Sequence, residues 1–259
     1  MKGTLSRPQI LCISGHDPSG GAGLQADIEA VAAQGAHALV AVTCLTVQNT
    51  RDVSRVVPTA PSLLAQQLEA VLDDCPVAAI KIGLIGDAAQ IPAIVAAIKR
   101  AAVPVVLDPV LRAGGGANLA AAATALALLT ELLPRATIIT PNAAEARRLA
   151  PGLEDLDACG RALVAAGCAN VLITGGDEPT ESVINTWHRQ GADARCYRRP
   201  RVPGTFHGAG CTLAAALAAR LALGEALQLA LERAQDYVAH CLQRALTVGQ
   251  GRPIPGRLP

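Results

Sequence analysis

Short apolar runs rich in β-branched residues alternate along the chain with longer, alanine-rich segments of helical periodicity. The apolar runs predict strands at 9–14, 38–45, 78–82, 104–108, 136–140, 170–174 and 182–187. The longer segments predict helices at 21–34, 61–74, 88–101, 118–131, 142–150, 156–166, 210–221 and 225–245. Several strands, such as those at 39–42 and 103–107, are apolar on both faces, which is typical of a parallel sheet covered by helices on both sides. The pattern predicts a three-layer α/β/α protein with a mostly parallel central sheet.

The periodic segments leave only the two ends of the chain outside the predicted domain. A chain of 259 residues has room for one large or two small domains, and no repeat or long linker divides this one. We expect a flexible N-terminus at 1–8, a single domain at 9–248 and an irregular C-terminal tail at 249–259, where Gly and Pro are frequent.

Composition and charge exclude several classes of function. Apolar residues make up 51% of the chain and charged residues 17%, which excludes disorder. The net charge is +1 and there are few aromatic residues, so the chain offers neither a basic patch nor a stacking platform for nucleic acid. Its longest apolar stretches, 119–129 and 213–223, are shorter than the ~20 residues that a membrane-spanning helix needs. These observations favour a small-molecule ligand, with no nucleic-acid or membrane partner.

The eight cysteines are scattered along the chain, without a CxxC pair, and the N-terminus has no apolar signal-peptide core. Such cysteines are typical of reduced thiols in an intracellular protein. We therefore expect a cytoplasmic protein.

A glycine-rich loop, residues 15–23, follows the first predicted strand, at the end of the sheet where α/β proteins bind ligands. Residues 21–26 fit the dinucleotide pattern G-x-G-x-x-A. However, no acidic residue that could hold a ribose lies between Glu29 and Asp52, and the loop is longer than the dinucleotide turn. Two alternatives remain: a turn that caps a helix, or a loop that binds a small polar ligand with the help of Asp17 or Asp27.

A second glycine-rich segment, HGAGCT at 207–212, leads into a long apolar helix. Gly208 and Gly210 allow a ligand to approach the backbone closely, and free N–H groups at a helix start bind anions. Cys211 falls in the first turn, where the pKa of a thiol is expected to fall. The alternative is a glycine turn followed by a buried cysteine.

Four further polar residues end strands or begin helices. Asn142 and Glu145 have the spacing of a capping box, and the same side chains could orient a hydrated Mg²⁺. Asp108 could hold a metal ion or start a turn. Lys81 ends an apolar strand and is either a phosphate ligand or a surface lysine. The dipeptide Gly-Lys is absent, so any use of ATP would not involve a P-loop.

Taken in order, six segments resemble the hydroxymethylpyrimidine kinase/phosphomethylpyrimidine kinase family of thiamine biosynthesis, within the ribokinase-like superfamily. They are GHDPSGGAGLQAD at 15–27, LTVQNT at 45–50, KIG at 81–83, LDPV at 107–110, TPNAAE at 140–145 and HGAGCTL at 207–213. The resemblance spans about residues 9–245. It implies a ribokinase-like fold, a homodimer, and Mg²⁺-assisted transfer of phosphate from ATP to 4-amino-5-hydroxymethyl-2-methylpyrimidine and then to its monophosphate.

The resemblance also implies roles for individual residues. Gln48 would recognise the aminopyrimidine, because a carboxamide both donates and accepts hydrogen bonds. The pocket around the pyrimidine would be bordered by Gly15, Asp27, Val110 and Cys211. The transferred phosphoryl group would lie in an anion hole made by Gly208, Ala209 and Gly210. Cys211 would take the proton of the substrate hydroxyl or align that hydroxyl.

The remaining roles concern the nucleotide and its metal ion. Asn142 and Glu145 match a magnesium-orienting pair, with Asp108 as a further metal ligand, and Thr174 and Gly176 match positions near the nucleotide. We expect Lys81 to bind the phosphate of the monophosphate, so that Lys81→Met would impair the second phosphorylation more than the first. Two positions depart from the family pattern: Ala209 replaces a usual threonine, and Thr174 stands where many relatives have lysine.

Two other functions remain open on the same fold. Pyridoxal kinase is one, because some relatives with the cysteine motif phosphorylate pyridoxal. A non-catalytic pyrimidine-binding protein is the other, although such a protein would need neither Cys211 nor the predicted magnesium ligands. A nicotinamide-dependent oxidoreductase is disfavoured by the missing ribose-binding acid.

Overall fold

The computed structural model describes residues 7–111 and 122–258. A single nine-stranded sheet in the order β3-β2-β1-β4-β5-β6-β7-β8-β9 crosses this part of the molecule. The strands are β1 (Gln9–His16), β2 (His37–Gln48), β3 (Val53–Pro58), β4 (Val77–Ile82), β5 (Val105–Leu107), β6 (Ile138–Ile139), β7 (Asn170–Ile173), β8 (Ser182–Arg189) and β9 (Ala192–Pro200). The strands from β2 to β7 in this order pair in parallel, whereas β3, β8 and β9 are antiparallel to their neighbours.

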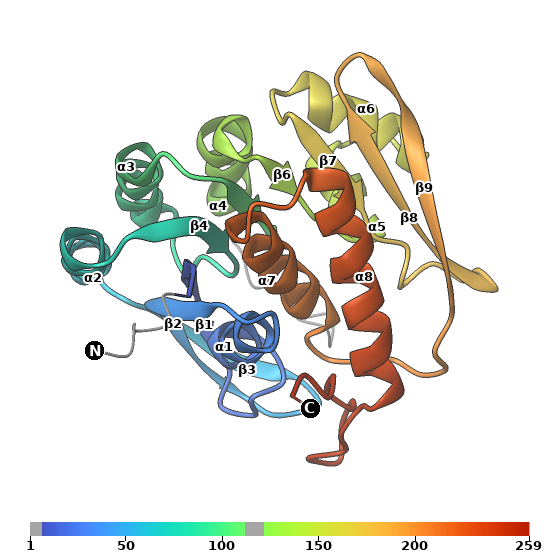
Figure 1. Ribbon diagram of the computed structural model, residues 1–259, viewed down its shortest axis with the longest axis horizontal. Helices are drawn as coiled ribbons and strands as arrows, with labels where there is room; N and C mark the ends of the chain where they lie inside the picture. The colour runs from blue at the N-terminus through green and yellow to red at the C-terminus, as the bar shows by residue number, and fades with distance from the viewer. Residues whose placement is uncertain (1–6, 112–121, 259) are drawn as a thin grey trace, which may run out of the picture.

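Helices cover both faces of the sheet, which confirms the three-layer prediction (Figure 1). They are α1 (Gly23–Ala33), α2 (Pro61–Asp74), α3 (Ile91–Ala101), α4 (Ala122–Ala127), α5 (Ala143–Leu149), α6 (Leu156–Ala165), α7 (Ala209–Ala222) and α8 (Leu227–Gln243). Short helical turns lie at Ala88–Gln90, Leu128–Leu132 and Leu133–Arg135. In β1, Ile10 and Cys12 belong to a core with α1, α7 and α8, while Leu11 and Ile13 belong to a core with the helices α2–α6. Each face of the sheet therefore has its own apolar core.

Strands β3 and β9 were not among the predicted elements. Most of their residues are half-buried or exposed, because β3 and β9 are the two edges of the sheet. An edge strand gives few side chains to the cores, as β9 does with Tyr197, so it has no need of an apolar run, and neither segment contains one. The two strands nevertheless extend the sheet beyond the helices, and β3 forms a hairpin with β2 beside the pocket described below.

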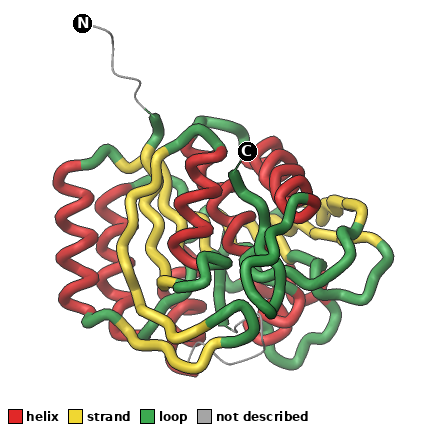
Figure 2. Tube along the Cα trace, turned by 90° about the horizontal axis from the view of Figure 1, so that it is seen from below, coloured by secondary structure: helices red, strands yellow, loops and turns green. Residues whose placement is uncertain are grey.

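The C-terminal tail has no helix or strand, apart from an isolated bridge between Leu246 and Ile254. It runs back over the domain instead of away from it (Figure 2). Residues 254–257 are buried, and Arg257 is only 2% exposed. The tail is therefore irregular in backbone conformation but closely packed. Within residues 7–111 and 122–258, no helix is long and apolar enough to cross a bilayer.

Candidate active site

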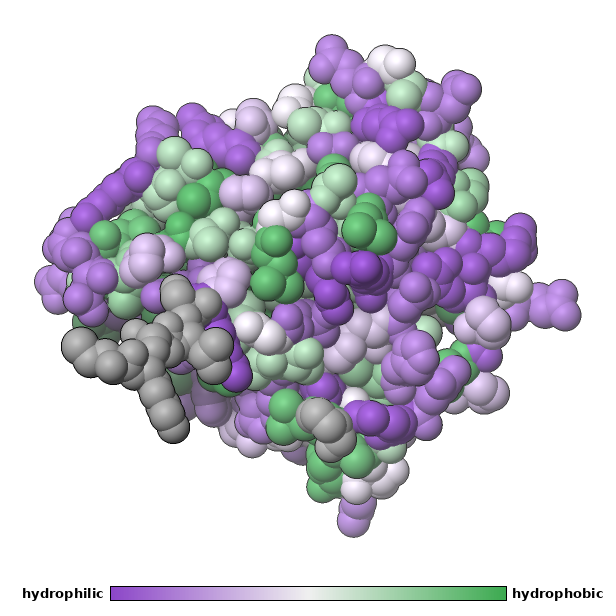
Figure 3. Space-filling view, in the orientation of Figure 1, coloured by the Kyte–Doolittle hydropathy of each residue, from purple (hydrophilic) through white to green (hydrophobic). Residues whose placement is uncertain are grey.

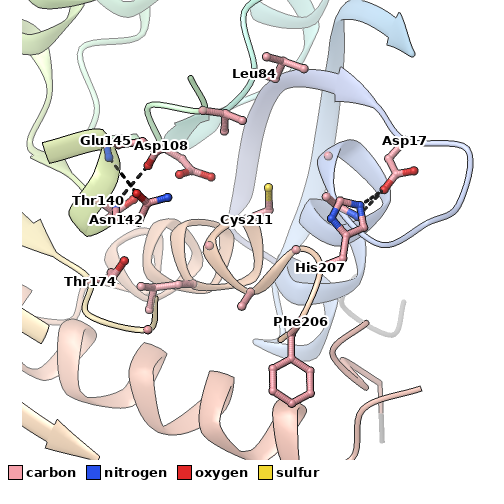
Figure 4. Close-up of a pocket in the computed structure, with 18 of the residues that line it drawn as sticks. Asp17, Leu84, Asp108, Thr140, Asn142, Glu145, Thr174, Phe206, His207 and Cys211 are labelled. Carbon is pink, nitrogen blue, oxygen red and sulfur yellow. Dashed lines mark hydrogen bonds and ion pairs between the residues drawn. The ribbon is translucent and has the colours of Figure 1, made fainter. Parts of the chain in front are cut away.

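A cavity of about 460 Å³ lies where the carboxyl ends of the parallel strands meet the N-terminus of α7. All but two of the predicted site residues line it: Gly15, Gln48, Asp108, Val110, Asn142, Glu145, Thr174, Gly176, Gly208, Ala209, Gly210 and Cys211. In Figure 4, Cys211 lies between a group of side chains around Asp108 and Glu145 and the pair formed by Asp17 and His207. The fold thus brings together segments that are up to two hundred residues apart.

The N-terminus of α7 has the backbone geometry that the glycines predict. Gly208 precedes the helix with a φ of 90°, and a Cβ there would lie 1.8 Å from the carbonyl oxygen of Gly21. Only glycine fits this position. The first N–H groups of a helix have no partner within it, so this turn presents donors and the positive end of the helix dipole to an anion.

Cys211 lies in the first turn of α7, as predicted, but its ionisation differs from the expectation. Burial raises the pKa of the thiol to about 12; Lys81 opposes this shift, while the carboxylates of Asp108 and Asp27 add to it. The predicted fall in pKa is therefore wrong, because the helix dipole does not offset the loss of solvent and the nearby negative charges. The thiol is protonated at neutral pH.

The side chains of Asp27 and Lys81 do not line the cavity. Each is fully buried, and Lys81 Nζ lies 2.7 Å from Asp27 Oδ1 and 2.9 Å from Asp27 Oδ2. Gly83 leaves space for this ammonium group, since a Cβ at Gly83 would lie 2.6 Å from Lys81 Nζ. This corrects two expectations: Asp27 does not border the substrate pocket, and Lys81 is held beneath it by an ion pair rather than facing a phosphate.

Asp108 and Glu145 form a buried pair of carboxylates that fits a magnesium ion. Burial raises the pKa of Asp108 to about 6; for Glu145, burial and the nearby Asp108 raise it to about 8. In the described chain, Asp108 Oδ2 and Thr140 Oγ1 are buried without a hydrogen-bond partner. A divalent cation at this position would reduce the repulsion between the two carboxylates and would provide a partner for the unpaired oxygen atoms. Within the described residues, no group of three His, Cys, Asp or Glu is placed to hold a metal ion. Mg²⁺ prefers oxygen ligands and keeps several water molecules.

The capping interpretation of Asn142 and Glu145 is confirmed. Asn142 Oδ1 accepts a hydrogen bond from the N–H of Glu145 at 2.9 Å, and Glu145 Oε2 accepts one from the N–H of Asn142 at 3.0 Å. The other carboxylate oxygen of Glu145 accepts from the N–H of Leu111 at 3.3 Å. These bonds fix the carboxylate at the edge of the cavity, so capping and metal orientation are compatible.

Asp17 and His207 join the two glycine-rich segments. His207 Nε2 lies 2.7 Å from Asp17 Oδ2, and Asp17 also accepts hydrogen bonds from Ser19 and from the N–H of Ala22. Burial alone would raise the pKa of Asp17, but the hydrogen bonds from His207, Ser19 and Gln48 hold it well below its ordinary range. The loop at 15–23 is thus tied to the start of α7 through a hydrogen-bonded pair that faces the cavity.

Comparison with known proteins identifies the family. The family description "Phosphomethylpyrimidine kinase" matches residues 17–255. The chain belongs to this family. A hydroxymethylpyrimidine/phosphomethylpyrimidine kinase of Synechococcus elongatus is 39% identical over 96% of both chains, and one of Haemophilus influenzae is 38% identical over 94% of both.

Solved structures agree with this assignment. The structure of an ADP complex of Bacillus subtilis pyridoxal kinase has a TM-score of 0.89 at 28% identity, covering 97% of this chain and 98% of the other. Phosphomethylpyrimidine kinase from Clostridium difficile has a TM-score of 0.79 at 30% identity, covering 90% and 98%. The predicted ribokinase-like kinase fold is confirmed.

Sequence reasoning missed several residues that line the cavity of this kinase. They are Asn185 on β8, Phe206 before α7, Val238 and Leu242 on α8, and Arg252 in the tail. The sequence contains a sign of the role of Asn185, because a polar residue within an apolar strand needs buried hydrogen-bond partners. In the structure, Asn185 accepts a hydrogen bond from the N–H of Gly175 and donates one to the side chain of Gln235. No feature of the sequence indicates a role for Arg252, because nothing in the neighbouring residues predicts that the tail returns to the cavity.

Proposed function

We propose that this kinase transfers the γ-phosphoryl group of ATP to the hydroxyl of 4-amino-5-hydroxymethyl-2-methylpyrimidine, and then a second one to the resulting monophosphate, in thiamine biosynthesis. The observation that carries the proposal is that one cavity contains Gln48, the N-terminus of α7 and the carboxylates of Asp108 and Glu145. A carboxamide suits the aminopyrimidine, and the helix start suits a phosphate. The names of the relatives support the same reaction.

In this proposal the pyrimidine lies beside Gly15, Gln48 and Val110, with its hydroxymethyl group directed to Cys211. Because the pKa of the Cys211 thiol is raised to about 12, Cys211 orients the hydroxyl rather than acting as a preformed thiolate base. The hydroxyl oxygen attacks the γ-phosphorus, the bond from phosphorus to the ADP oxygen breaks, and the hydroxyl proton passes to an oxygen of the transferring phosphoryl group. The first turn of α7 stabilises the charge of that group. Such a reaction depends mainly on positioning and charge stabilisation.

The nucleotide would lie along the opposite side of the cavity, near Thr174 and Gly176, with apolar contacts from α8. Asp108 and Glu145, with Asn142, would hold the magnesium ion there. When bound, Mg²⁺ neutralises negative charge on the phosphates. Structures of related kinases with ADP and with the ATP analogue AMP-PCP support ATP as the donor.

The second step needs a cation for the phosphate already on the substrate, and Arg252 is the candidate in place of Lys81. Among the described residues that line the cavity, which include Gln48 and Val53, Arg252 has the one permanent positive charge. The backbone N–H of Arg252 donates a hydrogen bond to the carbonyl of Thr50 at 3.0 Å, and this bond holds the residue next to the turn between β2 and β3. We assign Arg252 to the acceptor phosphate.

Pyridoxal kinase is the second candidate, because the Bacillus subtilis enzyme of that name covers almost the whole chain at a TM-score of 0.89. Purified protein with ATP and Mg²⁺ should be offered the pyrimidine alcohol and pyridoxal in parallel, and the products identified by mass spectrometry. A pyrimidine diphosphate would support the proposal. Pyridoxal phosphate with unchanged pyrimidine would replace it by the second candidate, and no product from either would favour a binding protein.

Variants should accompany this assay. Cys211→Ala should lower kcat by about 100-fold, the size of loss expected when a reacting group is no longer held in position. Cys196→Ala is the matched control, since Cys196 is exposed on β9. Equal activity of the two variants would remove Cys211 from the mechanism.

We also propose that the kinase acts as a homodimer in the cytoplasm. All eight cysteines are free thiols, which suits a reducing compartment. Leu45, Val47 and Val57 lie on the face of the β2–β3 hairpin that points away from the cavity, and they are 57%, 48% and 42% exposed. An apolar group of this kind is a candidate for contact with a second copy of the chain.

A further inference from the structure

The C-terminal tail carries a guanidinium group into the interior behind the active site. The side chain of Arg257 is fully buried, although it lies two residues from the end of the chain. Buried arginines are rare unless each donor finds an acceptor. The partners of Arg257 therefore indicate what this side chain does.

Arg257 bonds to three separate elements of the site. Its Nε donates to Thr212 Oγ1 in the first turn of α7 at 2.8 Å. Its Nη1 donates to the carbonyl of Gly20 at 3.2 Å, and its Nη2 donates to the carbonyl of Gly21, both in the glycine-rich loop. Nη1 also contacts Glu29 on α1 at 3.1 Å, which balances the charge.

These bonds converge on the anion site. Thr212 Oγ1, which accepts from Arg257, itself donates to the carbonyl of Gly208 at 2.7 Å. A Cβ at Gly208 would lie 1.8 Å from the Gly21 oxygen and 2.9 Å from Arg257 Nη2. The loop, the guanidinium and the residue preceding α7 are therefore in direct contact, so the position of one fixes the position of the others.

The tail has other attachments that do not involve this side chain. The N–H of His207 donates to the carbonyl of Pro253 at 2.9 Å, the N–H of Gly256 donates to that of Cys241 at 2.9 Å, and Ile254 pairs with Leu246. These bonds hold the tail against the domain without the side chain of Arg257. The hydrogen bonds of the Arg257 guanidinium therefore hold the active-site segments as well as the tail.

We propose that Arg257 is a positioning residue: it sets the distance between the glycine-rich loop, which borders the acceptor, and the first turn of α7, which binds the phosphoryl group. The proposal rests on the kinase function proposed above. A planar group with donors in fixed directions can join three elements, whereas an ammonium group cannot reproduce that geometry. Misplacement by about 1 Å far from the reacting atoms can cost about 100-fold in rate.

The test compares Arg257→Gln and Arg257→Lys with Arg220→Gln. Arg220 joins the opposite ends of the same two helices: its Nε bonds Gln34 after α1 at 2.8 Å, and its Nη1 contacts Glu225 after α7 at 3.2 Å. The kinetic constants for ATP and the pyrimidine should be measured well below the melting temperature of each variant. We expect kcat to fall about 100-fold in Arg257→Gln, with a smaller loss in Arg257→Lys and none in Arg220→Gln.

Hydrogen exchange provides a readout that does not depend on the substrate. In Arg257→Gln, backbone amides at 20–23 and 208–212 should exchange faster, while those of α2 and α3 should not change. If Arg257→Gln does not fold, Arg257→Lys keeps the charge opposite Glu29 and carries the test. Wild-type kcat in a folded Arg257 variant, or an equal loss in Arg220→Gln, would overturn the proposal. A wild-type protein without kinase activity would instead refute the proposed function, and the exchange data would still test the role of Arg257.

Discussion

At the scale of single residues, the buried pair of Lys81 and Asp27 leads to a prediction about stability. Lys81→Met would leave the Asp27 carboxyl buried without its cation, which typically costs about 3–5 kcal/mol. We expect urea denaturation to show a loss of that size in the free energy of unfolding. The double variant Asp27→Leu/Lys81→Met, which removes both charges, should recover most of it. A single variant as stable as the wild type would show that the pair contributes little.

Asp17 leads to a prediction about pH. Its pKa lies below the ordinary value of 3.8 in the folded protein, so the folded state favours the charged carboxylate. A group with a lowered pKa contributes stability above its unfolded pKa and loses it as the pH falls towards the folded value. Asp17→Asn should therefore cost on the order of 2 kcal/mol at pH 7, and the difference from wild type should shrink below about pH 4.

Chemical denaturation at pH 7, 5, 4 and 3 measures this effect of Asp17. Asp193→Asn, at an exposed position on β9, serves as the control and should match the wild type throughout. A constant difference between wild type and Asp17→Asn over the whole range would contradict the assignment of the lowered pKa to Asp17.

The same scale shows where sequence reasoning stops. Asp108 and Glu145 could be proposed for the site because they follow a predicted strand and begin a predicted helix, whereas the role of Gln48 came from the family resemblance. Whether Lys81 faces solvent or Asp27, and whether Cys211 ionises easily, depends on burial and on charges from distant segments. No local pattern contains that information.

At the scale of elements, the loop between β7 and β8 depends on Arg201, which follows β9. Its guanidinium donates to the carbonyls of Thr180 at 2.7 Å, Gly176 at 2.6 Å and Glu178 at 2.8 Å. Since Gly176 and Asp177 line the cavity, Arg201 holds the loop that we assign to the nucleotide. Arg201→Gln should raise KM for ATP by about tenfold, the equivalent of one hydrogen bond of ~1.4 kcal/mol, while KM for the pyrimidine stays unchanged.

Steady-state kinetics with each substrate varied in turn checks the role of Arg201. Arg198→Gln is the matched control, because Arg198 is exposed on the neighbouring strand β9. Parallel increases in both Michaelis constants would indicate a general disturbance of the cavity rather than of the nucleotide loop.

The elements also differ in how well the sequence predicts them. The strands of the two cores, β1 and β4 for example, have continuous apolar runs because helices cover both of their faces. The edge strands β3 and β9 lack such runs and were missed. The packing of the tail was missed for a similar reason, since Arg257 is buried by its partners and not by an apolar environment that a pattern could reveal.

At the scale of the whole molecule, apolar side chains remain exposed away from the active site. On the face shown in Figure 3, hydrophilic residues dominate around β8 and β9, and hydrophobic residues occur only in small groups. The β2–β3 hairpin is different: Leu45 and Val57 are direct partners across the two strands, and Val47 lies on the same face. Cross-strand apolar neighbours that no helix covers present a continuous surface to a second copy.

If the kinase forms the proposed homodimer through this face, Leu45→Glu should convert it into a monomer, because each of the two symmetric contacts would place a carboxylate against apolar side chains. Light scattering after size exclusion should give about twice the chain mass of 26.4 kDa for the wild type and the single mass for the variant. Leu63→Glu, at a position 51% exposed on α2, is the matched control and should remain dimeric. A monomeric wild type at micromolar concentration would refute the dimer. Because the opposite face of the same hairpin presents Thr46 and Gln48 to the cavity, loss of the dimer should also raise KM for the pyrimidine and leave KM for ATP unchanged.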